Sequence, residues 1–168
     1  LTARHPDLQF LHLTGANDVD KAHAAYAAPS SGAQVSNLRD TSKSEYAGWT
    51  PALRTLVQPF LTEMELALGA ATLVVSRAGA SSLAELAAMR VPAILVPLPT
   101  SADNHQYFNA RAFADTGAAR MLNQRTISPS QFAALVSDLL ANDAVRVQMQ
   151  AALAQWHQPT AAADIAER

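Results

Sequence analysis

Short apolar segments alternate with helical patterns along most of this sequence, and that alternation restricts the fold more than any other feature. The apolar segments are rich in branched residues and are typical of buried strands; they cover residues 8–13, 72–76, 92–98 and 118–122. Helical patterns cover residues 18–27, 62–68, 82–89 and 105–114. Strands that alternate with helices indicate a parallel sheet with both faces covered. We therefore predict an α/β fold with a doubly wound, Rossmann-like parallel sheet.

Further helices are predicted towards the C-terminus. Gly117 is placed to end the helix before it in a C-terminal cap. Ser128 followed by Pro129 predicts a helix start, and that helix runs to about residue 140. Another helix is predicted over residues 144–156, and a short one after Pro159. Residues 29–49 are polar and follow neither period, so a long mobile surface loop is predicted there.

Composition excludes several classes of function. A length of 168 residues and a hydrophobic content of 49% suit one globular domain over residues 1–168. The net charge of −2 gives no overall field that recruits nucleic acid or an acidic membrane surface. The absence of cysteine excludes disulfides, thiolate catalysis and cysteine zinc sites, and no apolar run approaches the roughly 20 residues of a membrane span. Because the chain begins with Leu1 rather than methionine, we expect it to be a piece of a longer protein.

The turn over residues 77–82 is the strongest candidate for a binding site. An apolar run ends at Ser76, Gly79 allows a tight turn, and Ser81 or Ser82 is predicted to cap the helix that follows. The unpaired backbone N–H groups of such a helix start attract an anion. In open parallel sheets, ligands bind beyond the carboxyl ends of the strands. The candidate site therefore also includes the loops over residues 14–17, 59–62 and 97–109.

Glu85 permits two interpretations. It lies three residues after Ser82, which is the spacing of a capping box, in which the glutamate bonds back to the helix entry. Alternatively, Glu85 faces the edge of the sheet and accepts hydrogen bonds from the two vicinal hydroxyls of a ribose. Thr62 and Glu65 have the same spacing, so the spacing alone does not decide between the two.

Gln106 and Asn109 lie three apart on one predicted helix face, where neutral donors and acceptors suit the hydroxyls of a sugar. The alternative is an ordinary helix start capped by Asp103 or Asn104.

Two further positions are less specific. Asp18 and Asp20 form an Asp-x-Asp pair of the kind found in metal sites, but they equally suit the acidic first turn of a helix, so no metal is predicted. His12 ends a predicted strand and points either into the site or into the core.

Three stretches taken together are similar to a known family. "PFLTEM", "LVVSRAGASSLAELAAMRVPAILVPLP" and "NHQYFNARAFADTGAA" resemble the donor-binding half of the undecaprenyldiphospho-muramoylpentapeptide beta-N-acetylglucosaminyltransferases, the MurG-like enzymes of peptidoglycan synthesis. The resemblance runs from Leu8 to the C-terminus, interrupted over residues 29–49. It implies a transferase of the GT-B type, with twin doubly wound domains and a cleft between them. This chain would be most of the second domain.

The resemblance also implies roles for individual residues. The backbone after the Pro-Phe pair, at Leu61, would contact uracil, and Glu85 would bind the ribose. The turn around Ser81 would contact the diphosphate and the sugar, and His105 would contact the sugar. The implied substrate-binding residues are Leu61, Arg77, Ala80, Ser81, Ser82, Glu85, His105, Gln106 and Asn109. The resemblance implies no catalytic residue and no metal ligand in this chain.

The sequence departs from the family at two places. The family's second domain opens with a strand and a glycine-rich loop that helps to hold the diphosphate, and nothing before Leu8 matches them. The family also carries glutamine after the histidine that ends the next strand, whereas this chain has Leu13 after His12.

These inferences together predict the donor-binding half of an inverting glycosyltransferase. It would move N-acetylglucosamine from UDP-N-acetylglucosamine to a lipid-linked muramoyl-pentapeptide, without a cofactor or metal. The catalytic base and the acceptor site are expected in the other domain, so this chain alone is expected to be inactive. The expected partners are the donor and the lipid-linked acceptor, not nucleic acid, and the full-length protein is expected in the cytoplasm, peripheral on the inner face of the membrane. The alternatives are another GT-B-type enzyme, such as a UDP-N-acetylglucosamine epimerase, and a nucleotide-binding module without catalysis.

Overall fold

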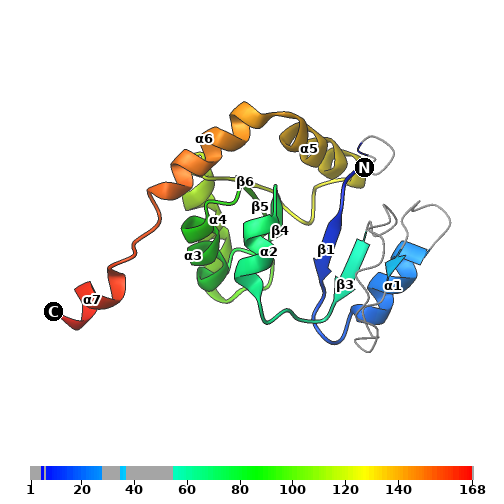
Figure 1. The fold of residues 1–168 in the computed structure, drawn as a ribbon, viewed down its shortest axis with the longest axis horizontal. Coiled ribbons are helices and arrows are strands. Elements are labelled where there is room, and N and C mark those ends of the chain that lie inside the picture. The colour runs from blue at the N-terminus through cyan, green and yellow to red at the C-terminus, as the bar shows by residue number, and fades with distance from the viewer. Residues whose placement is uncertain (1–4, 6, 28–34, 37–54, 168) are drawn as a thin grey trace, which may run out of the picture. The chain divides into compact units, whose positions relative to one another are not determined.

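The computed structural model describes residues 5, 7–27, 35–36 and 55–167 (Figure 1). The chain divides into two compact units, residues 1–62 and 63–168, and each contains its own three-stranded sheet. Every strand pairing in the two sheets is parallel, and helices separate most consecutive strands. The predicted α/β class with parallel strands is therefore confirmed.

Unit 1 contains β1 (Phe10–Leu13), α1 (Val19–Ala27), β2 (Val35–Ser36) and β3 (Thr55–Gln58). The strand order is β1-β3-β2, so β3 is the central strand. Every second residue of β3 is buried, as expected for the central strand of a sheet. The predicted strand over residues 8–13 and helix over residues 18–27 are confirmed in shorter form.

Two strands of unit 1 were not predicted. β3 is the run "TLVQ", which stops directly before Pro59 and is too short to show a period. β2 lies within residues 29–49, so the prediction of a loop is wrong at Val35–Ser36. A strand of only two residues, held by backbone pairing with β3, is too short to leave a pattern in the sequence. The other residues of that predicted loop lie outside the described residues.

Unit 2 contains β4, β5 and β6 in that order across a parallel sheet. Its elements, in chain order, are α2 (Met64–Ala70), β4 (Val74–Ser76), α3 (Ala80–Met89), β5 (Ala93–Leu95), η1 (Ala102–Asn104), α4 (His105–Asp115), β6 (Ala119–Met121), α5 (Pro129–Ala141), α6 (Asp143–Ala154) and α7 (Ala161–Ala166). All three strands and all the helices predicted for this part of the sequence are confirmed, most of them one to three residues shorter or shifted.

The core of unit 2 forms between the central strand and the helices beside it. All three residues of β5 are buried, as expected for the middle strand of a covered parallel sheet. α3 contributes Leu83, Leu86 and Ala87, and α4 contributes Ala110 and Phe113, spaced to lie on one helix face. α6 packs against α3 through its own buried face, which includes Leu153.

Helix ends follow the sequence signals where these are strong. Gly117 has φ 78° and lies directly after Thr116, the C-cap residue of α4, and the Ala118 N–H donates to Phe113 O at 2.9 Å, so the predicted C-terminal cap is confirmed. Ser128 caps α5 in a full capping box with Gln131, and Pro129 is the first helical residue. None of the helices in the described part of the chain is long and apolar enough to cross a membrane.

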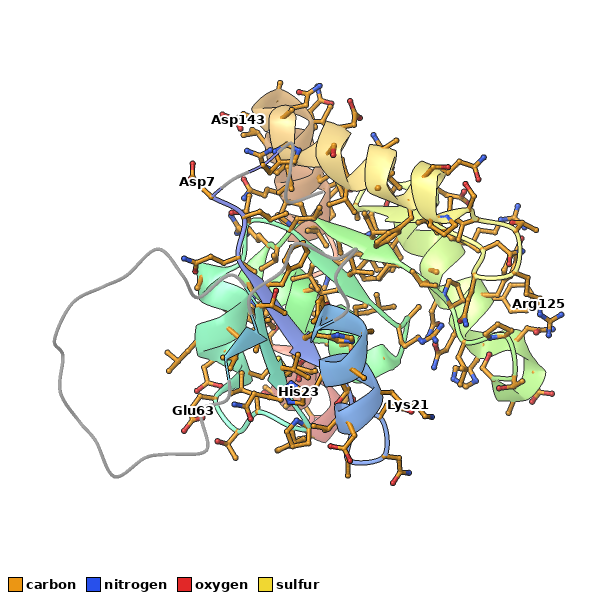
Figure 2. All side chains as sticks on the ribbon, turned by 90° about the vertical axis from the view of Figure 1, so that its right-hand side faces the viewer. Asp7, Lys21, His23, Glu63, Arg125 and Asp143 are labelled. Carbon is orange, nitrogen blue, oxygen red and sulfur yellow. The ribbon has the colours of Figure 1, made fainter. Side chains whose placement is uncertain are left out.

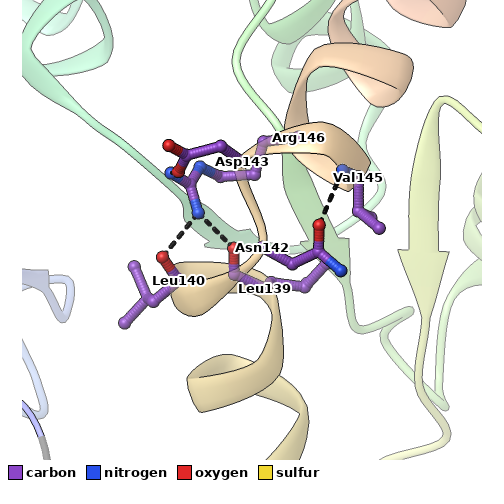
Figure 3. A network of polar contacts seen from close by, with 6 residues as sticks. All are labelled: Leu139, Leu140, Asn142, Asp143, Val145 and Arg146. Atoms are coloured by element: carbon purple, nitrogen blue, oxygen red, sulfur yellow. Dashed lines mark hydrogen bonds and ion pairs between the residues drawn. The ribbon is translucent and has the colours of Figure 1, made fainter.

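Arg146 holds the corner between α5 and α6 (Figure 3). Its guanidinium donates hydrogen bonds to the carbonyl oxygens of Leu139 and Leu140 in the last turn of α5, the latter at 2.6 Å. It also pairs with Asp143, and the Asn142 side chain caps α6 by accepting from the Val145 N–H at 3.1 Å. A cation at the C-terminus of α5 satisfies carbonyls that have no partner inside the helix.

We expect Arg146→Met to lower the free energy of unfolding by about 2 kcal/mol, because it removes charge-assisted bonds to two main-chain carbonyls. The Arg146 side chain is only 16% exposed, whereas that of Asp143 is 86% exposed. Asp143→Ala, which removes only the exposed ion pair, should therefore cost less than about 1 kcal/mol. Urea unfolding of both variants measures the difference. Equal losses would show that the ion pair, not the carbonyl bonds, stabilises the corner.

Candidate functional site

The N-terminus of α3 opens at the carboxyl end of β4 without a side-chain cap. After Ser76 the chain turns, and α3 begins at Ala80 with Gly79 as its N-cap residue. No side chain among the described residues caps this helix, and its first backbone bond runs from the Leu83 N–H to Gly79 O at 3.0 Å. The N–H groups of the first helical residues, Ala80, Ser81 and Ser82, therefore have no acceptor within the helix.

The prediction that Ser81 or Ser82 caps α3 is wrong. The extended backbone at Gly79 (φ −70°, ψ 147°) lets the helix start at the next residue, so both serines already lie in its first turn. Ser82 and Glu85 are consequently both inside the helix and cannot form a capping box. Glu85 is exposed and makes no hydrogen bond or ion pair with another described residue.

The same spacing at Thr62 and Glu65 does not coincide with the start of α2. The N-cap of α2 is Glu63, and its side chain makes no capping bond, so Thr62 lies before the helix and Glu65 within its first turn. The capping box considered for Ser82 and Glu85 thus does not form, whereas Ser128 and Gln131 form one at the start of α5.

Gly79 leaves the approach to α3 open. Its φ of −70° is accessible to any residue, and a Cβ added there would meet nothing within 4 Å in the described structure. Neither the backbone conformation nor crowding within the described residues requires glycine here. The absent side chain gives a ligand a clear path to the N–H groups of the first turn.

Two side chains of α4 bond to Ala78, the residue before Gly79. Gln106 Oε1 accepts from the Ala78 N–H at 3.3 Å and from the Leu98 N–H at 3.0 Å. Asn109 Nδ2 donates to Ala78 O at 3.1 Å. The structure thus brings together the predicted residues of α3 and α4 at one edge of the sheet, and it commits part of each amide to the protein itself.

Arg77 connects the loops that follow all three strands of unit 2. It follows β4, and its guanidinium Nη1 donates to Val96 O at 3.0 Å and Pro97 O at 3.4 Å, after β5. The same nitrogen donates to Gln124 Oε1 at 2.7 Å, after β6. Arg77 nevertheless remains exposed, and no carboxylate pairs with it in the described part of the chain.

His105 begins α4 and is exposed. Its Nδ1 lies 2.8 Å from Ala102 O, and because a carbonyl only accepts, Nδ1 carries the proton. In the neutral ring this leaves Nε2 as an acceptor. Neither Asp103 nor Asn104 caps α4 with its side chain, since Asn104 at the N-cap has φ 53° and makes no cap bond; the capping alternative is wrong.

Leu61 follows β3 and belongs to unit 1, where it is half-buried. In the same unit Asp18 accepts a hydrogen bond from Lys21 at 2.7 Å, which raises the pKa of Lys21. The described residues contain no group of three or more side chains placed to hold a metal. His12 does not point into the core: it is exposed, packs edge-on against Tyr26, and its Nδ1 lies 3.2 Å from the Tyr26 hydroxyl.

Comparisons with known proteins agree on one family. The model of the glycosyltransferase family 28 C-terminal domain matches residues 1–168. Two relatives named UDP-N-acetylglucosamine--N-acetylmuramyl-(pentapeptide) pyrophosphoryl-undecaprenol N-acetylglucosamine transferase are similar: one from Prosthecochloris aestuarii (40% identity over 70% of this chain and 32% of the relative) and one from Anaeromyxobacter dehalogenans (36% identity over 95% and 36%). The crystal structure of Acinetobacter baumannii MurG matches with a TM-score of 0.73 and 31% identity over 95% of this chain and 40% of that one. This chain spans about a third of the length of the curated relatives it matches.

We expect Arg77→Met to lower the free energy of unfolding by about 1 kcal/mol, because it releases the loops after β5 and β6 from one charged donor. Arg125→Met is the matched control. Arg125 lies next to Gln124, and Figure 2 shows it projecting outward from the same loop; its loss should change stability by less than about 0.5 kcal/mol.

A double-mutant cycle of Arg77→Met with Gln124→Ala separates the bond from other effects, and a coupling of about 1 kcal/mol is expected. Additive single effects would show that the two side chains do not act together in solution.

Proposed function

We propose that this chain, which belongs to the glycosyltransferase family 28 C-terminal domain family, is the nucleotide-sugar-binding half of an inverting transferase. The donor is UDP-N-acetylglucosamine and the acceptor is a lipid-linked muramoyl-pentapeptide, as the names of the relatives indicate for those proteins. The family membership favours a transferase over an epimerase or a binding module without catalysis.

The uncapped start of α3 is the observation that carries this proposal. The N–H groups of Ala80, Ser81 and Ser82 lack acceptors in the helix, and Gly79 places no side chain in front of them. Oriented N–H groups and the positive end of the helix dipole together favour a bound diphosphate. During transfer, negative charge grows on the departing diphosphate, so the same groups stabilise the transition state more than the bound donor.

Glu85 is the proposed ribose ligand. It lies on α3 beyond the diphosphate site, is exposed, and has no partner among the described residues, so its carboxylate is available to accept from two vicinal hydroxyls. Leu61 is the proposed uracil contact, through its backbone. Arg77 is proposed to add positive charge near the diphosphate, since its guanidinium has no carboxylate partner in the described ranges.

The sugar is proposed to meet α4. His105 Nε2, Gln106 Nε2 and Asn109 Oδ1 make no bond with another described residue, so they can bond sugar hydroxyls. No metal is required in this proposal, because the backbone supplies the positive potential that a cation otherwise gives.

The remaining chemistry is assigned to another domain of the full-length protein. An acceptor hydroxyl loses its proton to a general base and attacks the anomeric carbon while the diphosphate leaves from the opposite face. We assign the base and the lipid acceptor to that domain and place the full-length protein in the cytoplasm, peripheral on the inner face of the membrane. This chain holds the donor and stabilises the leaving group.

We expect Glu85→Ala to weaken UDP binding by about 1–3 kcal/mol, the range for leaving the ribose hydroxyls without their acceptor. Stability should change by less than about 0.5 kcal/mol, because Glu85 is exposed and caps nothing. Glu65→Ala, an exposed glutamate in α2, is the control and should leave UDP affinity unchanged. Calorimetric titration and thermal unfolding give both quantities. Unchanged UDP affinity in Glu85→Ala would exclude the ribose assignment.

Transfer itself is tested with the full-length protein, labelled UDP-N-acetylglucosamine and the lipid-linked muramoyl-pentapeptide. We expect disaccharide product, undiminished in excess chelator. The 168-residue chain alone should give none, because the proposal assigns the base and the acceptor site to another domain, and orientation of both substrates contributes roughly 7–11 kcal/mol. Product that disappears on chelation and returns with magnesium or manganese would refute the metal-free proposal. Product from the isolated chain would place the base within these residues.

A further inference from the structure

We propose that Gln106 and Asn109 act mainly as positioning residues, which fix the direction of the α3 N-terminus by holding both polar groups of Ala78. This inference rests on the proposed function, since it assigns these side chains to the diphosphate end of the donor rather than to the sugar alone. The pair is called the Ala78 clamp below.

The clamp begins from a burial constraint. Ala78 is 0% exposed, so water cannot reach its N–H or C=O. The N–H donates to Gln106 Oε1 and the C=O accepts from Asn109 Nδ2, so both partners come from α4. Only Gly79 separates Ala78 from the first helical residue. Fixing both polar groups of Ala78 therefore fixes the direction in which the N–H groups of the first turn point.

The accounting of donors and acceptors separates this role from direct sugar binding. Gln106 Oε1 already accepts two N–H groups, those of Ala78 and Leu98, so its lone pairs are used. Asn109 Nδ2 has given one of its hydrogens to Ala78 O. A sugar can bond only the remaining atoms, Gln106 Nε2 and Asn109 Oδ1. The clamp, in contrast, affects the binding of every ligand at the α3 N-terminus, with or without a sugar.

Two carboxylate substitutions distinguish the atoms that matter. Gln106→Glu keeps an oxygen facing the N–H groups of Ala78 and Leu98, so the clamp persists. Asn109→Asp replaces the donor to Ala78 O with an oxygen, so two acceptors face each other. Both substitutions add one negative charge to the same helix face, so any charge effect on an anionic ligand is common to both.

The measurements use the 168-residue chain and nuclear magnetic resonance titrations with UDP and with UDP-N-acetylglucosamine. We expect Asn109→Asp to raise the dissociation constants of both ligands about tenfold more than Gln106→Glu does, the equivalent of one hydrogen bond. Asn109→Ala should weaken the binding of UDP as well as that of UDP-N-acetylglucosamine, and it replaces Asn109→Asp if that variant does not fold.

Amide hydrogen exchange tests the clamp without any ligand. Gln106→Ala should speed exchange at both Ala78 and Leu98, whereas Gln106→Glu should leave both protected. Unchanged exchange in Gln106→Ala would overturn the clamp. If the variants lost affinity only for UDP-N-acetylglucosamine and all of them bound UDP normally, the clamp would be overturned in favour of direct sugar contact. A wild-type chain that binds neither nucleotide would instead refute the proposed function, and the exchange result would still decide whether the clamp exists.

Discussion

The need to satisfy one buried peptide position organises the carboxyl edge of unit 2. Ala78 is shielded from water, so its N–H and C=O must bond within the protein or leave a large desolvation cost uncompensated. α4 supplies both partners, and Gln106 also bonds Leu98 in the loop after β5. Arg77 extends the connection to Gln124 in the loop after β6. The position of α3 is therefore coupled to every loop at this edge.

Side-chain caps are present at some helix starts of the described structure and absent at others, since α2, α4 and α7 also lack one. α5 begins with a full capping box between Ser128 and Gln131, and α6 is capped by Asn142. α3 begins at Ala80 after its N-cap residue Gly79 and has no side-chain cap in the described structure, although Ser81 and Ser82 lie in its first turn. A side-chain cap typically stabilises a helix by about 1 kcal/mol, and at an uncapped start another group that accepts from the first-turn N–H groups can supply such stabilisation. The diphosphate is the group that we propose.

The sequence predicts the elements of unit 2 well, because each strand is apolar and each helix carries a period or a cap signal. It misses β3, which is four residues long, and β2, which is held by backbone pairing alone. It places Gln106 and Asn109 on one helix face but not their partner, since Ala78 is 28 and 31 positions away in the chain. Such a contact between elements leaves no local pattern. The same limit applies to the capping box considered for Ser82 and Glu85, because spacing does not show where a helix begins.

The side-chain amides of Gln106 and Asn109 each have two roles in the proposed donor site. One end of each amide bonds Ala78 and so supports the proposed diphosphate site, while the other end is left for hydroxyl groups. His105 differs, because its only bond within the described residues is to Ala102 O in its own helix entry, outside the clamp. In the proposed donor site, a change at His105 would alter what meets the sugar without moving α3. Under that proposal, discrimination among sugars can vary at position 105, whereas positions 106 and 109 are constrained by the proposed anion site.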